Sequence, residues 1–223
     1  MIIVDRKEGS TTGRLLAEQL TLADEDGIVN WTGRRNTESS ALNAASYTDK
    51  LRQLEALEQG GVPCTPFRTD MPREEGWLPR RRLHHNGLDF RKRRKKFKPD
   101  YWTKFIELAQ EWRLHVFKTA KGNYRIIRSG LKVAKDDDAH PWVRGHRQGW
   151  KISYVGGAPT PVKEASRAAL DALGLDFGAV DIGVKRNGHP VVIEVNTCPG
   201  LDTGTLQIYI KQIKERFDAE TRM

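Results

Sequence analysis

Apolar and polar residues alternate along the chain in short segments, which predicts strands and helices that follow one another closely. Thr48 is the expected N-cap of one helix, and the glycine pair at 60–61 ends that helix. This order of elements predicts a small α/β unit in the first 70 residues. The expected elements are strands at 2–4 and 27–31, helices at 14–20 and 48–58, and an extended segment at 62–67.

The rest of the chain predicts mainly antiparallel hairpins and two more helices. Residues 111–117 alternate strictly between polar and apolar, and a turn before residues 124–128 completes a hairpin. Helical spacing of apolar residues favours helices at 162–173 and 205–217. Helices that alternate with antiparallel strands predict an α+β fold.

The most informative pattern is a hairpin formed by residues 177–196. The Asn-Gly pair at 187–188 lies between two alternating runs and predicts a two-residue type I′ turn. With that turn, Asp181 lies directly opposite Glu194, and Asn196 is a diagonal neighbour on the same face. The opposite face would be wholly apolar, with the pairs Val184–Val191, Ile182–Ile193 and Val180–Val195.

The two opposed carboxylates of this hairpin point to a metal site. Like charges directly opposite each other on a sheet repel, and a divalent cation between them would reverse that effect. The oxygens of Asp181, Glu194 and Asn196 suit magnesium that also holds phosphate oxygens. The alternative is an exposed face with two hydrated acids. We favour the metal site, because exposed acids usually alternate with bases and the neighbours here are small or apolar.

Residues 173–182 and 192–201 together resemble the C-terminal half of an ATP-grasp ligase. In that family the residues that match Asp181, Glu194 and Asn196 hold two magnesium ions against the phosphates of ATP. The resemblance implies an α+β ATP-grasp fold, in which two lobes clasp a nucleotide, with a reduced N-terminal α/β pre-grasp unit. The expected boundaries are 1–70 for the pre-grasp unit and 71–223 for the ATP-grasp domain, with lobes at 71–105 and 106–223.

Further segments resemble parts of related ligases. Residues 48–54 are similar to the segment in which ribosomal-protein glutamate ligases place an ATP-contacting lysine, here Lys50. Residues 111–117 are similar to the strand that enters the large lobe. Residues 141–150 resemble the arginine-bearing loop of carboxylate–amine ligases that are often carried by bacteriophages, and residues 28–33 fit the N-terminal element of those proteins. The resemblance implies catalytic roles for Arg113, Arg144 and His146.

The segment expected to close over the triphosphate departs from the family pattern. The family has a lysine and a glycine-rich loop, whereas residues 80–88 hold three arginines, one glycine and no lysine. Arginine can replace the lysine on a phosphate, and Arg80 is the best positional match, with Arg81 or Arg82 as alternatives after a one-residue shift. Fewer glycines leave fewer backbone amides able to approach the phosphates.

Residues 101–105 fall where the interlobe linker of the family receives the adenine. The resemblance implies nucleotide contacts from Trp102, Thr103 and Lys104. An ordinary half-buried strand is an equally good interpretation of the same residues.

Together these features predict an ATP-dependent ligase. It would activate a substrate carboxylate as an acyl phosphate and join it to an amine, or less readily to a thiol. The expected cofactors are ATP and two Mg²⁺ ions, and the expected substrates are small-molecule or peptide carboxylates and amines. A non-catalytic descendant that only binds the nucleotide is an alternative, because of the altered loop.

The positive charge of the chain is confined to one segment. Lys and Arg exceed Asp and Glu by 9, but residues 80–98 hold ten of these bases and one acid, and the remainder is balanced. The stretch from Arg91 to Lys96 could recruit an acidic protein or a nucleic acid. A metal-dependent nuclease is the competing class, although Asn196 stands where such a site needs a lysine. A ligase whose substrate sits on such a partner would combine both interpretations.

The sequence gives no sign of a membrane partner. No run of about 18 uncharged apolar residues occurs, and the N-terminus becomes charged after four residues, unlike a signal peptide. The two cysteines, Cys64 and Cys198, suggest a reducing compartment. We expect a cytoplasmic protein, which acts in the host cytoplasm if a bacteriophage encodes it.

Overall fold

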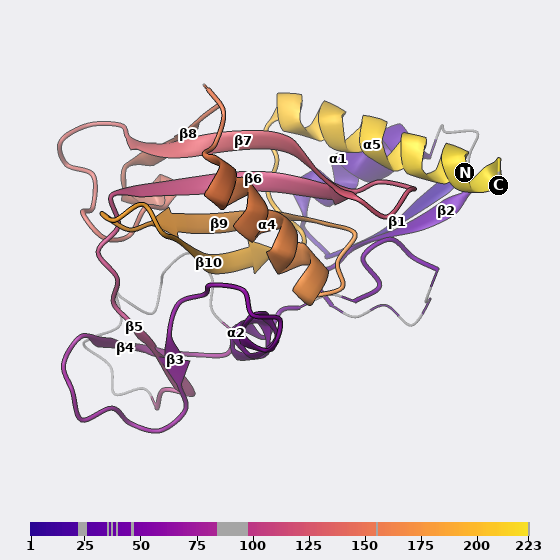
Figure 1. The fold of residues 1–223 in the computed structure, drawn as a ribbon. Coiled ribbons are helices and arrows are strands. Elements are labelled where there is room, and N and C mark those ends of the chain that lie inside the picture. The colour runs from indigo at the N-terminus through magenta and orange to yellow at the C-terminus, as the bar shows by residue number, and fades with distance from the viewer. Residues whose placement is uncertain are drawn as a thin grey trace.

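Strands and helices follow one another along the chain, and the strands of the described residues form three sheets (Figure 1). The computed structural model describes residues 1–21, 26–34, 36, 38, 40–45, 47–83, 98–154 and 156–222. Helices and antiparallel strands are both present in quantity, which confirms the predicted α+β class.

A five-stranded sheet forms the centre of the molecule, with the order β10-β9-β6-β7-β8. Every neighbouring pair in it is antiparallel. The predicted hairpins at 111–128 and 177–196 supply four of its strands. The strands are β6 (Gln110–Lys118), β7 (Tyr124–Ala134), β8 (Trp150–Ser153), β9 (Phe177–Val184) and β10 (Pro190–Asn196).

One face of this sheet is covered by helix α4 (Thr160–Ala172), which crosses the strands in front in Figure 1. The helix places apolar residues at helical spacing, and these pack on alternate residues of β6, β9 and β10. The interface is a continuous apolar core. Its buried members include Val162, Ala165, Ala169, Leu170, Leu114, Val116, Val180, Ile182, Val192 and Val195.

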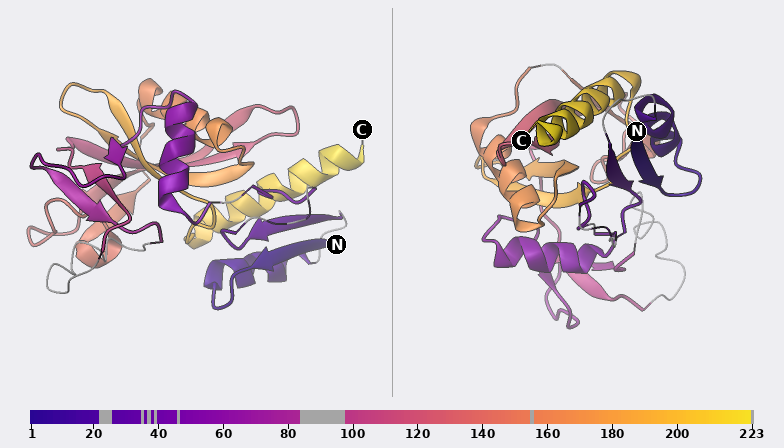
Figure 2. Two further views of the ribbon diagram at one scale, coloured as in Figure 1. Left: turned by 90° about the horizontal axis from the view of Figure 1, so that it is seen from below. Right: turned by 90° about the vertical axis from the view of Figure 1, so that its right-hand side faces the viewer.

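The opposite face is covered in part by helix α5 (Thr203–Thr221) and by the N-terminal unit beyond it (Figure 2). In that unit β1 (Ile2–Arg6) and β2 (Gly27–Trp31) are parallel, joined by α1 (Thr11–Leu20). An aromatic cluster fixes these layers together. Trp31 stacks on Phe177 at 5.2 Å and meets the ring of Tyr209 edge-on at 5.5 Å.

The third sheet has the order β3-β5-β4 and lies below the central sheet in Figure 1, next to α2 (Lys50–Gln59). Its middle strand β5 (Tyr101–Lys104) pairs with β3 (Phe67–Arg68) and with β4 (Trp77–Arg80).

One local prediction, the start of α2, differs from the structure. The N-cap of α2 is Asp49, not Thr48, because the Asp49 carboxylate accepts hydrogen bonds from the backbone amides of Leu51 and Arg52. Among the described residues, no helix is long and apolar enough to span a bilayer.

The register of the 177–196 hairpin is correct at the carboxylates and wrong near the turn. Asp181 pairs with Glu194, and Val180 with Val195, as predicted. Nearer the turn, the observed pairs are Val191–Gly183 and Val192–Ile182, so the predicted pairs Val184–Val191 and Ile182–Ile193 are wrong. The turn is longer than two residues, since the Lys185 amide donates to the His189 carbonyl.

A bulge restores the pairing in this hairpin. The register shifts by one residue between Val192 and Glu194, which leaves Ile193 as the extra residue. Val191 therefore shares a face with Gly183 and Asp181, whereas it was predicted on the apolar face.

Candidate functional site

Asp181 and Glu194 lie side by side on neighbouring strands, on the face of the central sheet that is turned away from α4. The Asp181 side chain is 4% exposed, whereas that of Glu194 is 29% exposed. The hairpin thus brings two carboxylates together and leaves one of them open to solvent.

Asp181 is held by two basic side chains, one from the adjacent strand β6 and one from β7 beyond it. Arg113 on β6 donates from Nε to Asp181 Oδ1 at 2.6 Å and from Nη2 to Oδ2 at 2.7 Å, which is a two-pronged ion pair. Lys132 on β7 donates from Nζ to Asp181 Oδ2 at 3.0 Å. The repulsion expected from the sequence is therefore already offset by protein side chains.

These contacts set the charge of the buried groups. Burial raises the pKa of Asp181, but the charges of Arg113 and Lys132 outweigh it and hold that pKa well below its usual range. The Asp181 carboxylate in turn raises the pKa of Arg113. Asp181 is consequently ionised at neutral pH, although it is buried.

Glu194 is paired with Lys50, the lysine expected to contact ATP. Lys50 Nζ lies 3.3 Å from Glu194 Oε2, and Asn196 Nδ2 donates to Glu194 Oε1 at 3.0 Å. The positive charge of Lys50 lowers the pKa of Glu194 to about 2, against the opposing effect of burial. The structure therefore brings Lys50, Glu194 and Asn196 into one cluster.

Helix α2 places Lys50 there because the helix is fastened to β10. The Gln53 amide donates to the Val195 carbonyl and accepts from the Val195 amide, both at 2.8 Å. Gln53 lies one turn after Lys50, so the same helix face meets the strand that carries Glu194. Gln53 was not among the predicted site residues.

Lys132 and Glu111 are further site residues that the sequence reasoning missed. Lys132 Nζ forms an ion pair with Glu111 as well as with Asp181, and both Lys132 and Glu111 are buried along most of their side chains. Burial raises the pKa of Glu111. Burial opposes the charged form of Lys132, but the carboxylates of Asp181 and Glu111 outweigh it and raise the pKa of Lys132. The polar alternation Glu111, Arg113, His115 along β6 was the available signal, and β7 extends beyond the predicted strand to include Lys132.

His115 continues the polar face of β6 into the aromatic cluster. It is 1% exposed, its Nδ1 lies 3.2 Å from the Tyr209 hydroxyl, and its Nε2 has no partner within the described ranges. Burial, and secondarily the charge of Arg113, lower the pKa of His115 to about 3. His115 is therefore a neutral core residue.

The predicted phosphate-contacting arginines lie near the start of α2. Arg82 Nη1 contacts the N-cap carboxylate of Asp49 at 3.0 Å, and the Arg82 carbonyl accepts from the amide of Lys50. Arg80 ends β4 and pairs with Tyr101. The stretch from Arg91 to Lys96, predicted to recruit a partner, lies outside the described residues.

The three residues expected to contact adenine all lie in β5. Thr103 is buried, whereas Trp102 and Lys104 are half-buried. Lys104 Nζ donates to the Glu75 carbonyl and lies over the ring of Trp77. The half-buried strand expected as an alternative is thus present, and the adenine contacts stay a prediction.

Arg144 and His146 lie in the segment between β7 and β8. Arg144 Nη2 donates to the Leu108 carbonyl at 2.8 Å, and its guanidinium lies 4.8 Å from the ring of Trp150. The charge of Arg144 works against the larger effect of burial on the pKa of Glu111. His146 instead meets Lys135 through its Nε2 at 3.3 Å. Within the described residues, His146 makes no contact with Asp181 or Glu194.

The donor set of the hairpin fits a hard divalent cation. Asp181 and Glu194 are both ionised, and the amide of Asn196 donates its N–H to Glu194, which leaves its oxygen as a ligand. These donors come from adjacent strands on one face. Arg113 and Lys132 already donate hydrogen bonds to Asp181, so a cation would share this carboxylate with them.

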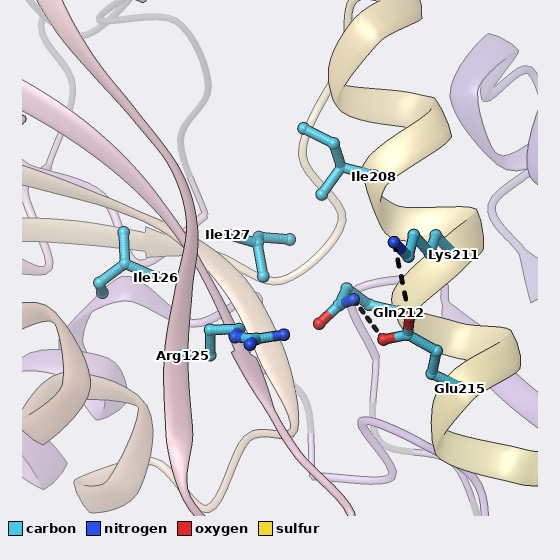
Figure 3. Close-up of a pocket in the computed structure, with 7 residues that line it drawn as sticks. All are labelled: Arg125, Ile126, Ile127, Ile208, Lys211, Gln212 and Glu215. Carbon is cyan, nitrogen blue, oxygen red and sulfur yellow. Dashed lines mark hydrogen bonds and ion pairs between the residues drawn. The ribbon is translucent and has the colours of Figure 1, made fainter. Parts of the chain in front are cut away.

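A separate groove of about 330 Å³ lies between β7 and α5 (Figure 3). Ile127 and Arg125 point from β7 toward the helix, where Glu215 pairs with Lys211 and Gln212. None of the predicted site residues lines this groove, so we do not assign it to the site.

Comparison with solved structures identifies the architecture. The chain is similar to the ATP-grasp ligase PsnB, with a TM-score of 0.65 and 11% identity over 99% of this chain and 98% of that one. It is similar to D-alanine–D-alanine ligase from Bacillus anthracis, with a TM-score of 0.65 and 13% identity over 99% and 96% of the two chains. The chain has the ATP-grasp fold. A third ATP-grasp neighbour is N5-carboxyaminoimidazole ribonucleotide synthetase from Thermotoga maritima, with a TM-score of 0.59 and 13% identity over 97% and 73%.

Sequence comparison adds one curated relative to these ATP-grasp structures. The chain is 28% identical over 156 residues to "Required for respiratory growth protein 9, mitochondrial" from Paracoccidioides brasiliensis (strain Pb03). The match covers 67% of this ATP-grasp chain and 54% of the relative, so the chain spans about half the length of the curated protein. No protein-family model matches the sequence.

Proposed function

We propose that this protein is an ATP-dependent ligase that joins a carboxylate to an amine, of the peptide or amino-acid type. The observation that carries the proposal is the clustering of Lys50, Asp181, Glu194 and Asn196 on one face of an ATP-grasp sheet. Some solved neighbours of this fold are complexes with nucleotide, among them PsnB with Mg and ADP and the Bacillus anthracis ligase with ATP. Those neighbours support the general reaction class and leave the substrates to be identified.

The reaction has two steps. A carboxylate oxygen of the substrate attacks the γ-phosphorus of ATP, so that ADP leaves and an acyl phosphate forms. An amine nitrogen then attacks the acyl carbon, inorganic phosphate leaves, and the nitrogen loses a proton. Because no bond to the protein forms, catalysis depends on positioning and on the neutralisation of charge.

Asp181, Glu194 and Asn196 hold Mg²⁺ in this proposal. When bound, the cation neutralises charge on the phosphates and orients them. Lys50 is suited to a phosphate, because its ammonium already lies beside Glu194 at 3.3 Å and its side chain is 13% exposed. Arg82, at the start of the same helix, and Arg80, at the end of β4, are assigned to the phosphates as well.

The remaining assignments follow the family resemblance. Arg113 lies 2.6 Å from Asp181, which favours a role beside the transferring phosphoryl group. Arg144 is assigned to the same phosphoryl group, and its charge lowers the pKa of Glu111 against the larger effect of burial. Residues 102–104, which are Trp102, Thr103 and Lys104, are assigned to adenine. The resemblance assigns His146 to catalysis, whereas its observed contact is with Lys135.

The test measures ADP release with Mg²⁺, ATP and a pool of amino acids and peptides. Glu194→Ala should reduce that release at least about 100-fold, because it removes a charged ligand for the cation. Glu164→Ala is the matched control, since Glu164 is exposed on α4 against the opposite face of the sheet. Turnover unchanged in Glu194→Ala would rule out the assignment of the site. ATP binding to the wild type without any turnover would favour the non-catalytic alternative.

A further inference from the structure

Lys132 is a buried cation placed between the carboxylates of Glu111 and Asp181, and Asp181 belongs to the proposed metal site. Its side chain is 10% exposed, and its ammonium contacts Glu111 on one side and Asp181 Oδ2 at 3.0 Å on the other. Lysine is rarely buried to this extent unless it is paired. The ammonium is therefore a permanent positive charge beside Glu111 and Asp181.

The lone pairs of Asp181 are largely occupied. A carboxylate offers about four lone-pair positions. Arg113 takes one on each oxygen, at 2.6 and 2.7 Å, and Lys132 takes a third on Oδ2. One position remains, which is enough for a single cation shared with Glu194.

The acids of the site are already paired with bases of the protein. The three acids Glu111, Asp181 and Glu194 are matched by three bases in direct contact with them. Two divalent cations would need an unpaired carboxylate for the second ion, and Asp181 does not provide one.

We propose that the Lys132 ammonium fills the place of a second divalent cation, so that the site binds one Mg²⁺ ion per nucleotide. The inference rests on the proposed function and replaces the pair of ions that the family resemblance implies. A lysine ammonium suits this role because it is a compact point charge with three donors.

The position of Lys132 is fixed by the sheet. Lys132 lies within β7 and pairs with Ile152 of β8, while its neighbour Leu131 pairs with Trp112 of β6. Glu111 anchors the ammonium from the far side. An incoming ion would therefore have to displace a side chain held by two carboxylates and by the strands on either side.

The experiment counts Mn²⁺ bound to the full chain at saturating ADP. Mn²⁺ replaces Mg²⁺ on oxygen ligands and is detected directly by electron paramagnetic resonance. We expect one Mn²⁺ per bound ADP in the wild type and two in Lys132→Met. Lys151→Met is the matched control, since Lys151 is exposed on the adjacent strand β8, and it should keep one.

The outcomes separate this inference from the proposed function. Two ions per ADP in the wild type, or one ion in a folded Lys132→Met protein, would overturn the inference and leave the ligase proposal standing. A wild type that binds neither ADP nor Mn²⁺ would overturn both. If Lys132→Met does not fold, the double variant Lys132→Met, Glu111→Gln removes both buried charges, and two ions are expected there.

Discussion

The two faces of the central sheet are built from the same strands but by different rules. The face toward α4 is filled by apolar side chains such as Leu114, Val180 and Ile182, all fully buried. The opposite face carries Arg113 and Asp181 at the neighbouring positions of the same strands. Alternation along β6 and β9 therefore divides each strand between a core and a site.

Because of this difference, we expect the two faces to respond differently to substitution of a side chain. Apolar packing is shared among many contacts, so loss of one side chain leaves a cavity but no unpaired group. On the charged face each ion depends on one or two named partners, such as Asp181 on Arg113 and Lys132. Removing one partner leaves the other charged group unpaired in a poorly hydrated environment.

The largest expected effect comes from the charged face. Arg113→Met should lower the free energy of unfolding by about 4 kcal/mol, because it leaves Asp181 buried without its two-pronged partner. Urea unfolding at neutral pH measures this loss of unfolding free energy. Adding Asp181→Leu to that variant should recover at least half of the loss. Arg186→Met, which breaks an exposed pair with Glu107, is the control and should leave stability unchanged.

A slightly smaller effect is expected on the apolar face. Ile182→Ala should cost about 3 kcal/mol in unfolding free energy, since Ile182 is fully buried against α4. ADP affinity, measured by calorimetry, should remain within a factor of two of the wild type. A large loss of affinity together with that destabilisation would show that the two faces are not separable.

The aromatic end of the charged face should respond to pH. The pKa of His115 in the folded protein, about 3, lies below that of an unfolded histidine, so the unfolded chain binds a proton first as the pH falls. His115 should therefore lower stability by roughly 2 kcal/mol between pH 7 and pH 5. His115→Gln should abolish this part of the acid destabilisation in urea titrations. The exposed His189→Gln variant should retain it.

The smallest expected effect concerns the helix that brings Lys50 to the charged face. Asp49→Ala should cost about 1 kcal/mol, because it removes the cap of α2. Thr48→Ala is the matched control and should have no comparable effect on the midpoint of thermal unfolding. Equal losses in the two variants would contradict the observed cap.

The relation of Asp181 to Glu194 could be predicted from the sequence, yet part of the reasoning behind it was wrong. The Asn-Gly pair indicated a hairpin correctly, but the turn is longer than two residues. The bulge at Ile193 compensates for the extra length and returns Glu194 to its place opposite Asp181. A bulge leaves no reliable signal in apolar alternation, because it moves only the residues between itself and the turn.

The partners of the carboxylates could not be predicted in full. From the sequence, the repulsion between the two acids predicted a metal ion between them. In the structure, the pairing of β9 with β6 also brings Arg113 to Asp181. That pairing joins residues 68 positions apart and depends on the order of strands in the sheet. Lys132 was missed for the same reason, and the helix boundaries were predicted to within a few residues because they depend on local spacing.

The attachment of α2 to β10 has a consequence for solubility. β10 is the outermost strand on its side of the sheet, and such an edge can template pairing with another chain. Here Gln53 occupies the backbone groups of Val195, and residues Pro63 and Thr65 occupy those of Val192. The segment that carries Lys50, the lysine proposed to bind the nucleotide, thus also shields the strand from self-association, so variants that loosen it would be expected to aggregate.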